Sequence, residues 1–313
     1  MAVHTDTVAP AAQAAGAPAG RARRKKGEGL VAYLFMAPYL VLFLGFIVAP
    51  AIYGIWISLH DYDFALVDKP WVGLANYVDL FTPSSRDFDD FWQSMGATGI
   101  FTLFSVPCLV VIPLLVSLLL NRKFPGRTFF RAVFFLPYVI GVAVIGLLFR
   151  YMLDANIGIV NYFLGHAIPW TTDLPWAWIS LVGMTVWWTL GYNALIYLAG
   201  LQDISPELYE AADMDGANRW QQFRNVTLPG LRPVMVFVIT ITILASANMF
   251  GQYFILTKGA PGTATRTIIG YIADEGLRSF RMGAAAAMSY VLAIVLLLIS
   301  LINFRVFREK DDA

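Results

Sequence analysis

Six long apolar stretches, with no charged residue in their interiors, constrain this chain more than any other feature. Each is long enough to cross a bilayer as a helix, for which roughly 20 apolar residues suffice. The stretches cover residues 30–59, 96–120, 132–149, 177–201, 233–256 and 283–304. Only 14% of the 313 residues are charged, whereas soluble domains carry about 25%. The sequence therefore predicts an all-α, polytopic membrane protein with six transmembrane helices.

Lysine and arginine are concentrated in two segments, which the positive-inside rule places in the cytoplasm. The N-terminal tail carries basic residues at 21 and 23–26, and the connection after the second stretch carries four more, at 122, 123, 127 and 131. Segment 60–95 has two basic residues against seven aspartates. We therefore expect both termini in the cytoplasm. Segment 257–282 conflicts with this topology, because it would be external yet carries Lys258, Arg266, Arg278 and Arg281.

The same pattern gives the domain organisation. Residues 1–29 predict a disordered cytoplasmic tail, rich in Ala, Pro and Gly, whose basic cluster touches anionic membrane lipid. Residues 30–304 form the six-helix membrane domain, with a core at about 96–304 and a partner-facing loop at 202–232. Residues 305–313 form a short cytoplasmic C-terminal tail.

Several classes of function are disfavoured. The net charge of +1 provides no basic field for a nucleic acid. The three histidines are scattered and the single cysteine, Cys108, lies in an apolar stretch, so we expect no metal site and no catalytic residues. No G-x-x-x-x-G-K-[ST] phosphate loop occurs, so no cofactor is expected on this chain. The apolar stretches also lack the ionisable residues that mark proton-coupled transport.

One stretch, residues 205–233, is amphipathic and rich in helix-capping residues. Ser205 suits an N-cap, Pro206 suits the first helical position, and Gly216 suits a left-handed turn that ends the helix. A second short helix is expected from Asn218 to Thr227, ending before Pro229. The result would be a helical bracket at the membrane surface, built to contact another protein.

The bracket also carries a resemblance to a known family. Glu210-Ala211-Ala212, three residues, Gly216, nine residues and then Val226-Thr227-Leu228-Pro229 resembles the EAA motif of binding-protein-dependent ABC importer permeases. The family usually has Ile where this chain has Val226. The segments WVGLANY at 71–77, FLPY at 135–138, LAGLQ at 198–202 and LTKGAP at 256–261 resemble the carbohydrate-uptake branch, maltose and glycerol-phosphate permeases among them. The resemblance covers roughly residues 30–304.

This resemblance implies the ABC importer type I permease fold and makes the bracket a coupling helix. The residues expected to couple the chain to an ATPase are Glu210, Ala211, Ala212, Asp215, Gly216, Leu228 and Pro229. The expected partners are a cytoplasmic ABC ATPase in two copies, which would bind ATP and Mg²⁺, a second homologous permease and an extracytoplasmic solute-binding protein. The expected location is the plasma membrane of a bacterium or archaeon. The alternative function is a self-sufficient secondary transporter or channel for a small polar solute.

Candidate substrate contacts are the polar and aromatic residues of the fourth and fifth stretches. They are Trp188, Asn193, Asn248 and Gln252. Asn248 and Gln252 are four residues apart and would share a helix face. The same amides could instead bond neighbouring helices, and Trp188 could be a packing residue. In the external segment 60–95, residues 71–81 could lie at the membrane interface or form a short external helix, and Asp87, Asp89 and Asp90 are expected to be solvated.

Overall fold

The computed structural model describes residues 28–308, and every regular element within them is helical. The predicted N-terminal tail with its basic cluster, and most of the C-terminal tail, lie outside the described residues. The chain divides into two compact units, residues 1–52 and 53–313. In the first, α1 (Glu28–Phe43), η1 (Leu44–Val48) and the start of α2 (Ala49–Ser58) are continuous. Their apolar side chains are largely exposed, as expected for a helix that faces lipid.

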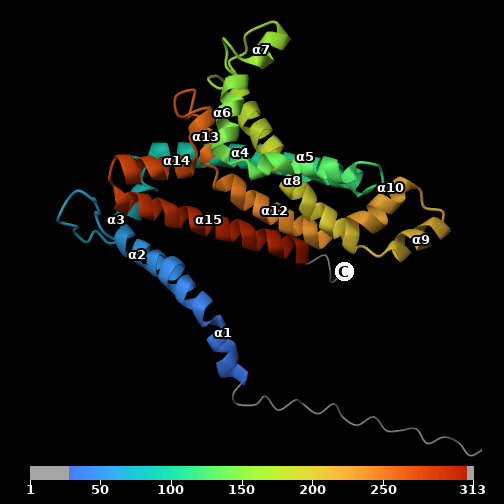
Figure 1. Ribbon diagram of the computed structural model, residues 1–313. Helices are drawn as coiled ribbons and strands as arrows, with labels where there is room; N and C mark the ends of the chain where they lie inside the picture. Colours follow the sequence, from blue (N-terminus) through green and yellow to red (C-terminus); the bar gives the residue numbers. More distant parts are fainter. Residues whose placement is uncertain (1–27, 309–313) are drawn as a thin grey trace, which may run out of the picture. The chain divides into compact units, whose positions relative to one another are not determined.

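The second unit holds the remaining helices (Figure 1). In chain order these are α3 (Ala75–Asp79), α4 (Phe88–Asn121), α5 (Arg127–Val139), α6 (Val142–Met152), α7 (Ile159–Leu164), α8 (Trp176–Asp203), α9 (Pro206–Met214), α10 (Arg219–Gln222), η2 (Phe223–Thr227), α11 (Leu228–Gly230), α12 (Arg232–Ala247), α13 (Gly251–Leu256), α14 (Ile268–Ala273), η3 (Asp274–Arg278) and α15 (Met282–Arg308). Helix α4 packs against both α8 and α12 and forms the centre of this unit.

Four described helices are long and apolar enough to cross a membrane, and two bent helix pairs bring the number to as many as six. The four are 34–58, 88–121, 176–203 and 282–305, which agree with four of the predicted stretches. The third predicted span is not one helix, because α5 and α6 meet at 94°. Ile140 and Gly141 are extended at this break, and glycine resists helix formation because it loses the most backbone entropy.

The fifth predicted span is also interrupted. Helix α12 ends at Ala247, and α13 begins only at Gly251. At the break, the Thr267 hydroxyl donates to the Met249 carbonyl at 2.7 Å. This bond satisfies a backbone acceptor that lies outside the regular helical hydrogen bonding. Asn248 and Gln252 therefore lie in different elements, and the prediction that they share a helix face is wrong.

Close backbone contact fixes α5 against α8. At Gly191 of α8, an added Cβ would lie 2.1 Å from the Phe134 carbonyl oxygen of α5. Only glycine permits two helices to approach so closely, a common device in membrane proteins. Around this contact and the α4 interfaces, buried side chains such as Phe101, Leu181 and Met184 fill the core.

A cluster of ionic side chains joins the start of α4 to the segment before α15. We call it the Arg281 cluster; it consists of Asp87, Glu275, Arg281 and Tyr271. The guanidinium of Arg281 donates to both carboxylate oxygens of Asp87 at 2.6 Å and to Glu275 at 2.7 Å. The pKa of Arg281 is raised, chiefly by the hydrogen bond to Asp87. Asp87 is almost fully buried, so the prediction that it is solvated is wrong.

The remaining basic residues of segment 257–282 are also largely neutralised. Arg266 pairs with Asp90, and Arg278 pairs with Asp274 at 3.1 Å. Because these pairs link segment 257–282 to the start of α4, the two segments lie at the same end of the unit (Figure 1). Three of the four basic residues of this segment are therefore paired with carboxylates of this chain.

Candidate functional site

Two regions of the second unit carry the candidate residues. Helices α9 to α11 form a bracket at one end of the unit, opposite α14 and the start of α15 (Figure 1). The second region is a cavity between α4, α5, α8, α12 and α13.

The bracket begins as predicted. The Ser205 side chain accepts a hydrogen bond from the Glu207 amide at 3.3 Å, and Pro206 opens α9. Gly216 has φ +75° and ends the turn after α9, a conformation that other residues adopt at a steric cost. Asn218 and Gln221 then form a reciprocal capping box at the start of α10.

The end of the bracket differs from the prediction. The helical backbone does not stop before Pro229 but continues through η2 and α11 to Gly230. The π-type turn at Phe223–Thr227 shifts the hydrogen-bond register immediately before the proline, and such bulges accommodate a residue that lacks an N–H. Two side-chain bonds hold the bracket together: the Tyr209 hydroxyl contacts Thr227 at 3.0 Å, and the Gln222 amide donates to Asp213.

The surface of the bracket combines charge with exposed apolar groups. Among the predicted coupling residues, Glu210, Ala211, Asp215, Gly216 and Pro229 are exposed, while Ala212 and Leu228 are half-buried. Neither Glu210 nor Asp215 forms an ion pair within the described part of the chain. Three apolar side chains are exposed beside them, Leu208 at 54%, Met214 at 89% and Trp220 at 68%, and sequence reasoning missed the last two. Large apolar residues on an otherwise polar segment were the signal that could have identified them.

The cavity has a volume of about 510 Å³, within the range of small-molecule sites. All four predicted substrate residues, Trp188, Asn193, Asn248 and Gln252, contribute to its lining. None of the 17 lining residues, all from the described second unit, is Asp, Glu, Lys, Arg or His.

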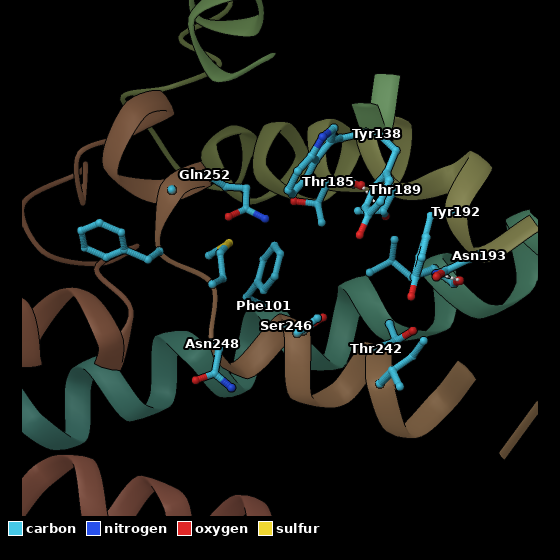
Figure 2. A pocket seen from close by; sticks show the side chains of 17 residues that line it. Phe101, Tyr138, Thr185, Thr189, Tyr192, Asn193, Thr242, Ser246, Asn248 and Gln252 are labelled. Atoms are coloured by element: carbon cyan, nitrogen blue, oxygen red, sulfur yellow. Dashed lines mark hydrogen bonds between the residues drawn. The ribbon is translucent and has the colours of Figure 1, made fainter. Parts of the chain in front are cut away.

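One wall of the cavity is aromatic. The ring of Tyr138 stacks on Tyr192 at a centroid distance of 4.5 Å and on Trp188 at 5.9 Å. The hydroxyl groups of Thr185 and Thr189 lie along the same wall, and the Gln252 amide points toward them from α13 (Figure 2). The signal in the sequence was a stripe along one face of the fourth span, since Thr185, Trp188, Thr189 and Tyr192 follow helical spacing.

The four predicted residues differ in how free their polar groups are. Trp188 donates from Nε1 to the Ile140 carbonyl, and Asn193 donates from Nδ2 to the Leu109 carbonyl, both at 3.0 Å. The Asn248 amide donates to the Leu244 carbonyl at 2.8 Å and points away from the Thr185 and Thr189 hydroxyls. The Gln252 side chain points toward them and forms no side-chain hydrogen bond with any described residue (Figure 2). The Thr242 hydroxyl is likewise buried without a partner among the described residues.

Comparison with known proteins relates both regions to one family. The family model of the binding-protein-dependent transport system inner membrane component matches residues 86–308. The arabinooligosaccharides transport system permease protein AraP of Bacillus subtilis is 34% identical over 87% of this chain and 87% of its own length. The trehalose/maltose transport system permease protein MalF of Thermococcus litoralis is 31% identical over 92% of this chain and 97% of its own length.

A solved structure agrees with the fold. A chain of a bacterial ABC transporter involved in the import of the acidic polysaccharide alginate superposes with a TM-score of 0.76 at 25% identity, covering 90% of this chain and 96% of that one. The match includes the polytopic helical architecture and the ABC importer permease fold expected from the sequence. The chain is therefore a multi-pass membrane transport subunit, not an enzyme, and it belongs to the family of binding-protein-dependent transport system inner membrane components.

Proposed function

We propose that this chain forms half of the membrane pathway of an ATP-driven importer for an uncharged carbohydrate. The observation that carries the proposal is the cavity, which combines an aromatic wall with hydroxyl and amide groups and has no ionised side chain. Aromatic faces bind the apolar C–H surfaces of a sugar ring, while hydroxyls and amides bind its hydroxyl groups. The relatives named for arabinooligosaccharides and for trehalose and maltose support this substrate class.

Within the cavity, Gln252 is the leading candidate for a direct contact with the sugar. Its amide is free to donate and accept, whereas Asn248 turns away. Replacing Gln252 with Leu should raise the apparent KM for uptake roughly tenfold, because a sugar hydroxyl then loses its partner on binding. The matched control is Asn248→Leu, for which the KM should change less than about twofold, within the spread of single surface-type substitutions.

Energy enters through the bracket. The exposed Glu210, Asp215 and Met214 form a mixed charged and apolar surface of the kind that partners recognise. We propose that a cytoplasmic ABC ATPase, present in two copies that bind ATP and Mg²⁺, docks on this coupling loop at 202–232. Docking requires the bracket to lie in the cytoplasm. With residues 30–304 as a six-span membrane domain, four spans precede the bracket and two follow it, so both chain termini then lie in the cytoplasm as well. A second homologous permease completes the pathway, and a solute-binding protein delivers the sugar from outside.

Reconstitution tests this proposal. The chain is co-expressed with a partner permease, ATPase and binding protein, purified in mild detergent and placed in liposomes, with maltose and arabinotriose as neutral probes and an alginate trisaccharide as the anionic probe. ATP-dependent uptake of a neutral probe is expected. Purification without any ATPase, together with uptake in the absence of ATP, would establish a secondary carrier instead. ATP-dependent uptake restricted to the anionic probe would overturn the substrate class.

A further inference from the structure

Two prolines interrupt the hydrogen bonding of α4 and free one backbone carbonyl each. A proline lacks the N–H that would bond the carbonyl four residues earlier. Pro113 thereby frees the carbonyl of Leu109, and Pro107 frees that of Leu103. The two sites differ in environment: Leu109 is 3% exposed, whereas Leu103 is 69% exposed. The buried carbonyl at Leu109 therefore needs a partner from elsewhere in the protein.

The partner is Asn193 of α8. Its Nδ2 donates to the Leu109 carbonyl oxygen at 3.0 Å, and the residue is itself 4% exposed. Asn193 thus replaces, from another helix, the bond that Pro113 removes. Leu109 and Asn193 both line the cavity, so this substitute bond lies at its edge.

The same face of α4 is tied to a second helix one turn earlier. Ser105 and Leu109 are four residues apart and therefore lie on one face of α4. The Ser105 hydroxyl donates to Ser246 of α12 at 3.0 Å. One side-chain bond to α8 and one to α12 therefore join α4 to two other helices around the cavity.

At other helix breaks near the cavity, freed backbone carbonyls also accept hydrogen bonds from side chains of other elements. The Ile140 carbonyl, at the break between α5 and α6, accepts from Trp188, and the Met249 carbonyl, at the break between α12 and α13, accepts from Thr267. In a membrane interior such freed groups must be satisfied by protein, because lipid offers no hydrogen bonds. Three side-chain donors around this cavity, those of Asn193, Trp188 and Thr267, are therefore already engaged by freed backbone carbonyls.

We propose that Asn193 is a positioning residue for transport, which holds α8 to the proline-freed carbonyl of α4, and not a direct contact of the transported solute. The proposal rests on the proposed function, since it concerns the geometry of the same cavity. It makes the role of Asn193 conditional on Pro113: if α4 regains its own hydrogen bond, the amide becomes dispensable. A residue that contacts solute would carry no such condition.

A double-mutant cycle tests this dependence in the assembled transporter. Asn193→Leu, close to isosteric, leaves the Leu109 carbonyl unpaired and is expected to lower the rate of uptake of maltose or arabinotriose roughly tenfold and the midpoint of thermal unfolding by roughly 2–6 °C. Pro113→Ala restores an N–H at position 113. In that background, Asn193→Leu should change the rate of uptake less than about twofold.

The matched control is Trp188→Phe, which removes the donor to Ile140. Pro113→Ala supplies no donor to the Ile140 carbonyl, so the loss of uptake caused by Trp188→Phe should be equal in both backgrounds. If Asn193→Leu is equally damaging with and without Pro113, or if Pro113→Ala rescues Trp188→Phe as well, the proposal is overturned. Should Pro113→Ala fail to reach the membrane, Asn193→His, which keeps an N–H donor, is compared with Asn193→Leu. Greater activity and stability of the His variant support the proposal, and equal losses overturn it.

The unfolding midpoint separates this proposal from the proposed function. The thermal cycle requires no transported solute, because it reads only the hydrogen bond between α8 and α4. Suppose that Pro113→Ala rescues the thermal stability of Asn193→Leu, while the wild-type transporter takes up neither neutral probe. This result would support the positioning role of Asn193 and refute the proposed substrate class. Uptake of a neutral probe without any rescue of thermal stability would support the proposed substrate class and overturn the positioning role of Asn193.

Discussion

The two ends of the second unit use charged residues in opposite ways. In the Arg281 cluster, the side chains of Asp87, Glu275 and Arg281 are 3%, 10% and 28% exposed, and each carboxylate is paired with the guanidinium. In the bracket, Glu210 and Asp215 are exposed and form no ion pair with any described residue. Buried charges that are paired with opposite charges of the same chain hold segments together. Charge left exposed beside apolar side chains is available to a partner.

This difference leads to contrasting expectations for stability and for transport. Removing one member of a buried ion pair leaves an uncompensated charge, which is costly. Removing an exposed, unpaired charge costs the fold little. Substitutions in the Arg281 cluster should therefore lower stability, whereas substitutions of the exposed charges in the bracket should spare the fold and impair coupling. Four variants, in decreasing order of their expected effect on stability, can break or sharpen this comparison.

Arg281→Met is expected to have the largest effect. It strands Asp87 and Glu275 in a buried site, and breaking such pairs costs about 3–5 kcal/mol. The measurement is thermal unfolding of the purified protein in detergent, together with the yield of folded protein. Arg278→Ala is the control, because Arg278 is 70% exposed and its pair with Asp274 is worth at most about 0.5 kcal/mol. Equal losses from the two variants would refute the claim that burial makes the Arg281 ion pairs important for stability.

Tyr271→Phe should have an intermediate effect. The Tyr271 hydroxyl donates to Asp87 at 3.3 Å, and losing a hydrogen bond to a carboxylate costs about 1.5 kcal/mol. Arg281 still holds Asp87 in this variant, so the fold should survive. Denaturation in detergent gives the difference directly. A loss as large as that of Arg281→Met would mean that the phenol, and not the guanidinium, organises the cluster.

The same tyrosine predicts a dependence on alkaline pH. Burial, followed by the negative charge of Asp87, raises the pKa of Tyr271 above its usual value. A raised folded-state pKa means that the stabilisation is fully present below about pH 10, the value of an unperturbed tyrosine, and is lost as the pH rises through the higher folded value. Unfolding midpoints measured above pH 10 should therefore fall less steeply for Tyr271→Phe than for the wild type. Parallel curves would contradict this assignment.

Gly216→Ala should cost about 1 kcal/mol, through backbone strain alone. The glycine is at φ +75°, and an added Cβ would have no neighbour within 4 Å, so steric clash contributes nothing. Gly183→Ala is the control: it also has no neighbour within 4 Å but lies within α8, where alanine is favoured over glycine. If both variants shift the unfolding midpoint in the same direction, the left-handed turn is not what ends α9.

Local chemistry explains why the sequence predicted some elements and missed others. The start of α9 follows from Ser205 and Pro206, because capping depends on neighbouring residues alone. The breaks at Ile140 and Met249 depend on donors 48 and 18 residues away in the chain. Hydropathy reads such broken helices as continuous, since the window around each break remains predominantly apolar.

The candidate site shows the same limit. The sequence identified residues that line the cavity, because polar side chains in apolar spans are rare and costly. It could not distinguish Gln252, whose amide is free, from Asn193, whose amide donates to the Leu109 carbonyl that Pro113 frees. Donor and acceptor of this bond are 84 residues apart in the sequence. That distinction requires the packing of α4 against α8. For the same reason, the burial of Asp87 could not be foreseen without its partner Arg281.

Glu210→Ala should leave the stability of the purified chain unchanged, because the carboxylate is exposed and has no partner among the described residues. Its effect should appear only in the assembled transporter, where ATP-dependent uptake falls while the chain remains folded in the membrane. Uptake and ATP hydrolysis are measured on the same liposomes, so that a loss of coupling is distinguished from a loss of ATPase binding. Asp203→Ala, an exposed carboxylate at the end of α8 just outside the EAA motif, is the matched control and should alter neither quantity. An unfolding midpoint lowered as far as that of Tyr271→Phe would show that Glu210 serves the fold, and the contrast between the two ends would no longer hold.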